Sequence, residues 1–195
     1  MHTHRQGQGE YYLLSCNDCN AAKFTSYQFH PWNLPETFVP FDNSFAESLK
    51  GYSALGEIGL DRLRGPELNI QRRYLDALLE VASAANLPVV IHNVRCEAEL
   101  FSALKGFAPN VLIHGFRGGA KALEKYLEHG WFVSFSDISN ASMLEYLKSQ
   151  GLNNTGIESD DSSESISEIA AKIAQKTDAD VFSNSITTFR KFFKI

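Results

Sequence analysis

The clearest structural pattern in the sequence reads YSALGEI over residues 52–58, then PELNIQRRYLDALLEVASAAN over 66–86 and LPVVI over 87–91. The first and last of these are short apolar runs, which are typical of buried strands. The middle one has apolar residues at helical spacing and a proline in its first turn, where the missing N–H is not needed. A strand, a helix and a strand in this order predict a βαβ unit of a parallel sheet.

The same alternation continues toward the end of the sequence. Further strands are expected over 110–113, 131–135 and 155–157, and helices over 97–105, 119–129, 140–149, 163–176 and 179–193. Repeated βα units of this kind are typical of barrels and open parallel sheets. The predicted fold class is therefore α/β, a TIM-type (β/α) barrel.

The first fifty residues follow this pattern less well. Strands are expected over 11–15 and 24–29, but only residues 5–10 separate the first of them from His4. A crossover between parallel strands normally takes a dozen or more residues, so no helix fits there. The chain has 195 residues, whereas a full barrel typically has about 250. We therefore predict a single domain over residues 1–195, with a barrel that is trimmed or incomplete near the N-terminus.

Composition and charge narrow the choice of protein class. Hydrophobic residues make up 44% and charged residues 21% of the chain, which is ordinary for a globular protein. No apolar run is long enough to span a bilayer and no signal peptide is recognisable, so a cytoplasmic protein without membrane association is expected. The net charge of −5 provides no general basic surface for nucleic acid. Binding to nucleic acid would have to be local or mediated by a metal ion.

Six residues with side chains that bind metals occur at the start of the chain or at the expected carboxyl ends of strands. They are His2, His4, Glu57, His92, His114 and Asp160, and they include four of the six histidines. The carboxyl ends of barrel strands converge on one mouth, so these residues are expected to meet in space. Nitrogen and oxygen ligands without cysteine suit zinc, manganese, nickel or magnesium. Six ligands exceed the needs of one catalytic ion and favour a site for two divalent ions.

An ordered series of motifs carries a resemblance over nearly the whole chain. The series is His2-Thr3-His4, Phe29-His30-Pro31-Trp32, Gly56-Glu57-Ile58-Gly59-Leu60-Asp61, Leu87-Pro88-Val89-Val90-Ile91-His92, Ile113-His114-Gly115-Phe116 and Glu158-Ser159-Asp160. It resembles the TatD-related metal-dependent hydrolases. The resemblance implies a binuclear phosphodiesterase site.

In that site His2, His4 and Asp160 would hold one ion, and His92 and His114 the other. Glu57 would be shared by both ions, and His30 and Arg95 would face the substrate. Glu57 and Asp160 would be catalytic, with Asp160 close to the attacking water as both ligand and proton acceptor. The sequence departs from the family at two places. Met1 stands where an aspartate usually precedes the histidine pair, and Arg95 follows His92 by three residues where two are usual.

The function expected from these residues and from the resemblance is metal-assisted hydrolysis of a phosphodiester. The expected substrate is DNA or a small phosphodiester, and no obligate protein partner is expected. The two ions would lower the pKa of bound water and offset charge on the phosphate. Two alternatives remain at this point, because a barrel supports many chemistries. One is an amidohydrolase-type enzyme acting on a small amide, lactone or cyclic amide with the same ligands. The other is a degenerate barrel that serves as a metal-binding or interaction module.

Overall fold

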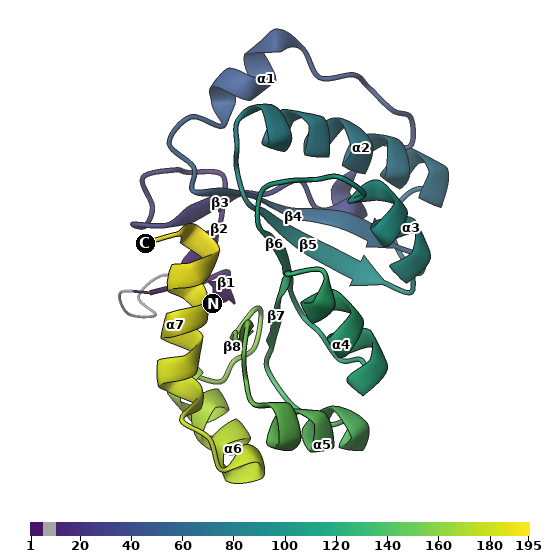
Figure 1. Ribbon diagram of the computed structural model, residues 1–195. Helices are drawn as coiled ribbons and strands as arrows, with labels where there is room; N and C mark the ends of the chain where they lie inside the picture. Colours follow the sequence, from purple (N-terminus) through teal and green to yellow (C-terminus); the bar gives the residue numbers. More distant parts are fainter. Residues whose placement is uncertain (6–10) are drawn as a thin grey trace. The chain divides into compact units, whose positions relative to one another are not determined.

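The computed structural model describes residues 1–5 and 11–195 (Figure 1). The chain divides into two compact units. Unit 1 consists of Met1–Leu14 and Leu112–Ile195, and unit 2 consists of Ser15–Val111. Within the described residues, eight strands are hydrogen-bonded in their order along the chain, from β1 to β8. Each pair with a defined register is parallel. Strands in this order, followed by helices, define a TIM-type (β/α) barrel, as predicted.

Unit 2 contains the βαβ segment from which the fold was predicted. Its elements are β3 (Thr25–Tyr27), the 3-10 helix η1 (Pro31–Asn33), α1 (Asn43–Ser48), β4 (Ala54–Asp61), α2 (Leu68–Ala84), β5 (Val89–Val94) and α3 (Glu97–Ala103). The longest helix, α2, covers β4 with an apolar stripe that includes the buried side chains of Tyr74, Leu75 and Leu78. The helix α1 was not predicted. It has six residues and begins after Asp42, whose side chain accepts the Ser44 N–H.

Unit 1 contains the later βα repeats and the beginning of the chain. Its elements are β1 (His2–Thr3), α4 (Ala120–Glu128), β7 (Phe132–Phe135), α5 (Ala141–Gln150), β8 (Thr155–Ile157), α6 (Ile166–Thr177) and α7 (Val181–Phe193). The strands β2 (Leu13–Ser15) and β6 (Val111–Ile113) include the unit boundaries. The helix α7 packs along β8, where the Thr188 hydroxyl donates to the Thr155 carbonyl at 2.8 Å. Among the described residues, no helix is both long and apolar enough to cross a membrane.

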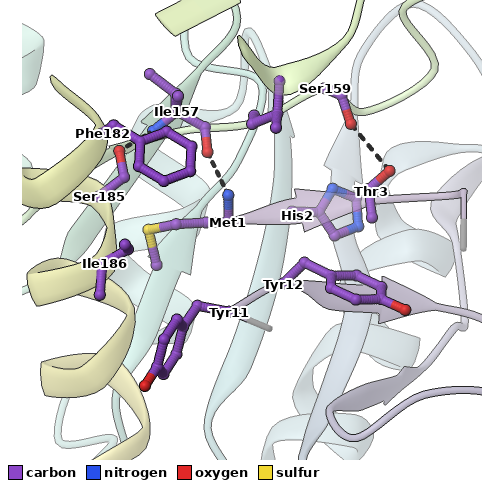
Figure 2. A pocket seen from close by; sticks show the side chains of 11 residues that line it. Met1, His2, Thr3, Tyr11, Tyr12, Ile157, Ser159, Phe182, Ser185 and Ile186 are labelled. Carbon is purple, nitrogen blue, oxygen red and sulfur yellow. Dashed lines mark hydrogen bonds between the residues drawn. The ribbon is translucent and has the colours of Figure 1, made fainter. Parts of the chain in front are cut away.

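Within unit 1, the first strand pairs on both of its edges. On one edge His2 and Thr3 pair with Leu13 and Leu14 of β2. On the other edge Thr3 forms a parallel bridge with Asp160, and the Asp160 N–H donates to the His2 carbonyl at 3.3 Å. The Met1 nitrogen also donates to the Ile157 carbonyl (Figure 2). The first strand therefore joins the segment that follows the last strand, which is the pairing that closes a barrel.

The prediction of a barrel trimmed near the N-terminus is confirmed. The described residues between β1 and β2, which are 4–5 and 11–12, contain no helix, and neither does the segment between β2 and β3. Residues 6–10 of the predicted connection lie outside the described part of the chain. From β4 onward, each strand is followed by an α-helix.

The strand β4 bulges where it presents Glu57. Leu55 pairs with Val89 and Ile58 with Ile91, so β4 has one residue more than β5 over this interval. A bulge of this kind bends a strand and changes the direction of its side chains. Two glycines allow the neighbouring backbone to approach closely. A Cβ atom on Gly56 would lie 2.5 Å from the Val90 carbonyl oxygen, and one on Gly59 would lie 2.0 Å from the His92 carbonyl oxygen.

The boundaries of β4 and β5 correct one expectation. Glu57 and His92 were expected at the ends of strands 52–58 and 87–91, but both lie inside longer strands. The pairing of β4 with β5 continues through Asp61 and Val94. A glycine such as Gly59 often marks the end of a strand in a sequence. Here Gly59 has a φ of 148° and still pairs with His92, so the strand continues. The other expected end positions hold, since His114 directly follows β6 and Asp160 lies just beyond β8.

Candidate metal centre

In unit 1, two of the predicted ligands from the start of the chain meet Asp160. The His2 Nδ1 atom lies 3.7 Å from Asp160 Oδ1, and the His4 Nε2 atom lies 3.5 Å from the same oxygen. The bridge between Thr3 and Asp160 sets these positions, and the Ser159 hydroxyl supports it by donating to Thr3 Oγ1 at 2.9 Å (Figure 2). Two imidazoles therefore approach one carboxylate oxygen.

The same unit places His114 beside His2 and adds a carboxylate that was not predicted. The ring centroids of His2 and His114 are 4.9 Å apart. Glu158 is completely buried, and its Oε2 atom lies 3.9 Å from His2 Nδ1. One ligand atom from each of His2, His114 and Glu158 lies within 4.8 Å of the other two. We call these three residues together with His4 and Asp160 the unit 1 cluster.

Glu158 is held by hydrogen bonds from two other strand ends. The N–H of Gly115, the residue after His114, donates to Glu158 Oε1 at 2.5 Å. The Ser134 hydroxyl of β7 donates to Glu158 Oε2 at 2.6 Å. Because a buried carboxylate is costly without such donors, this network fixes Glu158 against the turn that carries His114. The sequence signal for Glu158 was its acidic side chain two residues before Asp160, just after an apolar strand.

Unit 2 gathers a second set of predicted residues around Glu57. The Glu57 side chain is buried, and its Oε2 atom lies 3.3 Å from His30 Nε2 and 4.0 Å from His92 Nδ1. The rings of His30 and His92 are in edge contact, with centroids 4.6 Å apart. We call His30, Glu57 and His92 the unit 2 cluster. One ligand atom from each of the three lies within 4.8 Å of the other two.

Asp61, which was not predicted as a site residue, orients His92. Its Oδ2 atom lies 3.1 Å from His92 Nε2 and accepts the indole N–H of Trp32 at 2.5 Å. Its Oδ1 atom accepts the backbone N–H groups of Leu63 and Arg64. Burial alone would raise the pKa of Asp61, but the hydrogen bonds from Trp32, Leu63 and His92 lower it below its ordinary value. Because the Asp61 carboxylate contacts Nε2 of His92, the other ring nitrogen, Nδ1, faces Glu57. Histidines that bind metals commonly have this arrangement.

His30 differs from His92 in the atom that faces Glu57. The backbone N–H of Trp32 donates to His30 Nδ1 at 3.2 Å, so that nitrogen carries no proton. In the neutral ring the proton is then on Nε2, which is the atom that faces Glu57. A protonated ring nitrogen donates a hydrogen bond and does not bind a metal ion. In this tautomer His30 Nε2 donates toward Glu57, and the role of His30 toward substrate remains a prediction.

Arg95 has no contact with the unit 2 cluster among the contacts of the described residues. Its side chain is exposed, its φ is 55°, and its carbonyl accepts the Arg62 Nε–H at 3.0 Å. The predicted role of Arg95 toward substrate therefore remains a prediction. The remaining predicted residues each have a neighbour from the predicted set within their own unit.

The spacing of the donor atoms fits divalent metal ions. Atoms that bind one tetrahedral ion at about 2.1 Å lie about 3.4 Å from each other. The separations of 3.5 and 3.7 Å at Asp160 and of 3.9 Å at Glu158 are longer than ordinary N–H···O hydrogen bonds. They are close to the separation of atoms that share an ion. Imidazole and carboxylate together suit zinc, manganese and nickel, and carboxylate also suits magnesium.

Replacing Asp61 with asparagine is expected to weaken metal binding by His92. Both oxygens of Asp61 accept hydrogen bonds, so the amide group of asparagine would place an N–H against existing donors in either orientation. Loss of a carboxylate that orients a histidine ligand typically costs about 10- to 100-fold in metal affinity. Equilibrium dialysis against Zn²⁺ or Mn²⁺ measures the change. The control is Asp76→Asn, which affects a pair with Arg72 on the surface of α2. Equal affinities in both variants would contradict the role of Asp61.

These features define a class, the α/β barrel proteins with histidine and carboxylate clusters suited to divalent metal ions. The chain belongs to the TatD related DNase family, which it matches over residues 17–186. His2 and His4 precede the matched segment.

Comparisons with individual proteins agree with the family. The chain is 30% identical over 92 residues to the Deoxyribonuclease Tat-D of Schizosaccharomyces pombe, covering 44% of this chain and 30% of that protein. It is 33% identical over 83 residues to the uncharacterized metal-dependent hydrolase YjjV of Escherichia coli, covering 41% of this chain and 32% of that protein. The aligned part of the chain therefore spans about a third of these curated relatives.

Solved structures share the fold over almost the whole chain. The crystal structure of YjjV, a TatD homologue from Escherichia coli, has a TM-score of 0.72 at 18% identity and covers 95% of this chain and 87% of that one. A hydrolase of the TatD family from Entamoeba histolytica has a TM-score of 0.70 at 14% identity and covers 95% and 82%. At these identities the likeness establishes the barrel fold.

Proposed function

We propose that this chain is a divalent-metal-dependent phosphodiesterase, a TatD-like deoxyribonuclease that acts as one hydrolase domain over residues 1–195. The substrate class is DNA or a small phosphodiester. In the proposed site His2, His4 and Asp160 hold one ion, His92 and His114 hold the other, and Glu57 is shared. The observation that carries the proposal is that members of this set approach one another at ligand spacing within each unit. Membership of the TatD family supports it.

The residues of the two clusters have distinct tasks in this proposal. When bound, the ions lower the pKa of a water molecule and offset negative charge on the phosphoryl oxygens. Asp160 has a partly exposed side chain and accepts the proton of the attacking water. His30 faces the substrate in this proposal, with Nε2 as its hydrogen-bond donor. Asp61 holds His92 in its orientation. Arg95 is proposed to face the substrate, where a guanidinium binds phosphate oxygens.

Removal of metal is expected to abolish hydrolysis. The purified protein is assayed on single-stranded DNA and on bis-p-nitrophenyl phosphate after treatment with a chelator, with elemental analysis of the same samples. We expect turnover to fall by at least about 100-fold and to return when the correct metal is added, because the ions supply several kcal/mol of charge stabilisation. Separate additions of Zn²⁺, Mn²⁺, Ni²⁺ and Mg²⁺ identify the metal, and the bound metal per chain gives its number. No hydrolysis of either substrate with any of the four ions would overturn the proposal.

A further inference from the structure

A solvent-facing arginine lies directly on an aromatic ring beside the unit 2 cluster. The guanidinium carbon of Arg64 is 3.7 Å from the ring centroid of Trp32. The Arg64 side chain is exposed, and Trp32 retains 40% of its surface exposed. A guanidinium stacked on indole is attracted by the ring and loses rotational freedom, while the N–H groups at its edge still point outward.

The ring below Arg64 is fixed to the residues around Glu57. The Trp32 indole N–H donates to Asp61 Oδ2, the oxygen that also contacts His92. The Trp32 ring is in edge contact with the rings of His30 and His92, with centroid separations of 4.6 and 5.5 Å. The backbone N–H of Arg64 donates to Asp61 Oδ1 at 3.2 Å. Both ends of the Arg64–Trp32 stack are thus tied to the carboxylate that orients His92.

The charge of Arg64 is not neutralised within the described residues. Nearby Arg62 pairs with Glu99, and Arg72 pairs with Asp76. Across residues 1–5 and 11–195, the Arg64 guanidinium makes neither an ion pair nor a hydrogen bond. A cation that is held in place but lacks an acidic partner suits an anionic ligand. The planar guanidinium matches two oxygens of one phosphate group.

We propose that Arg64, supported by Trp32, binds a backbone phosphate of a nucleic acid strand whose hydrolysis the clusters catalyse. The inference rests on the proposed function and adds a residue outside the predicted site. Trp32 acts here as a positioning residue, because it holds the guanidinium and reaches the cluster through Asp61. Fixing the side chain before binding lowers the entropic cost of the contact.

The test measures binding of a fluorescent single-stranded DNA oligonucleotide by anisotropy in the presence of a chelator, at several salt concentrations. Each phosphate contact on a single strand contributes about 0.7 to the slope of log K against log salt. Arg64→Gln is expected to lower affinity by about tenfold at low salt and to reduce the slope by about 0.7. Arg64→Lys keeps the charge and is expected to retain the slope with weaker binding. The thermal unfolding midpoint of Arg64→Gln should equal that of the parent protein.

Arg73→Gln is the matched control, since Arg73 also lies over an aromatic ring, Phe38, but on helix α2. It is expected to bind the oligonucleotide like the parent protein. An unchanged slope in Arg64→Gln, or absence of oligonucleotide binding by the parent protein, would overturn the proposal. Hydrolysis assays separate the two proposals. Normal hydrolysis with an unchanged Arg64→Gln slope defeats only the proposal for Arg64. A changed slope without metal-dependent hydrolysis defeats the proposed function and leaves Arg64 as a phosphate contact without a catalytic role.

Discussion

Glu57→Ala is expected to remove phosphodiester hydrolysis while leaving the fold largely intact. Glu57 is the carboxylate between His30 and His92 in unit 2, and it is proposed to be the ligand common to both ions. Without it, both the charge that binds the ions and their fixed spacing are lost. Since bound ions supply several kcal/mol of transition-state stabilisation, we expect kcat to fall by about 1000-fold or more. The measurement is the metal-saturated rate on bis-p-nitrophenyl phosphate, with circular dichroism to monitor the fold.

Glu80→Ala is a suitable control for this experiment, because Glu80 is exposed on helix α2. It should retain the activity and spectrum of the parent protein. If Glu57→Ala hydrolysed the substrate at the parent rate, the assignment of the catalytic site to this cluster would be wrong.

Glu158→Ala is expected to lower both metal affinity and the stability of the metal-free protein. The change leaves the Gly115 N–H and the Ser134 hydroxyl without their acceptor in a buried position. Loss of a buried, hydrogen-bonded carboxylate costs about 2–4 kcal/mol of unfolding free energy. The turn after His114 also loses its support, so we expect metal affinity to fall by at least about tenfold. Urea unfolding of metal-free protein and equilibrium dialysis measure the two effects separately.

Two further variants test how Glu158 acts. Glu158→Gln keeps the size of the side chain but replaces one acceptor oxygen by an N–H₂ group, so its stability should lie between those of the parent and Glu158→Ala. Ser134→Ala removes one donor and is expected to cost about 1 kcal/mol. Metal-free stability that is identical in Glu158→Ala and the parent would show that the network has no structural role.

The sequence predicted the barrel because short apolar runs and segments with helical spacing alternate regularly in its later part. The strand β8 has the predicted bounds, and α2 begins and ends within two residues of the predicted helix. The trimmed N-terminal region followed from the length of the connection after His4. The helix α1 was missed because six residues are too few to show a helical period.

The sequence predicted the candidate site residues that follow apolar runs. It missed those whose role depends on hydrogen-bond partners far away in the sequence. His114 and Asp160 follow apolar runs, and that position is visible in the sequence. Glu158 and Asp160 are both acidic and lie close together, but only the structure shows that Glu158 accepts hydrogen bonds from Gly115 and Ser134. These partners are 43 and 24 residues away. Asp61 was missed for the same reason, since its link to His92 spans 31 residues.

The pairing of the first strand with Ile157–Asp160 has a consequence for how the protein is made. Thr3 and its partner Ser159 are separated by 156 residues. At translation rates of about 5–20 residues per second, His2 emerges from the ribosome roughly 8–30 seconds before Asp160 exists. Binding of a cation by the proposed ligands His2, His4 and Asp160 therefore cannot take place before Asp160 has been synthesised. On this edge the first strand stays without its partner until residues 157–160 have emerged.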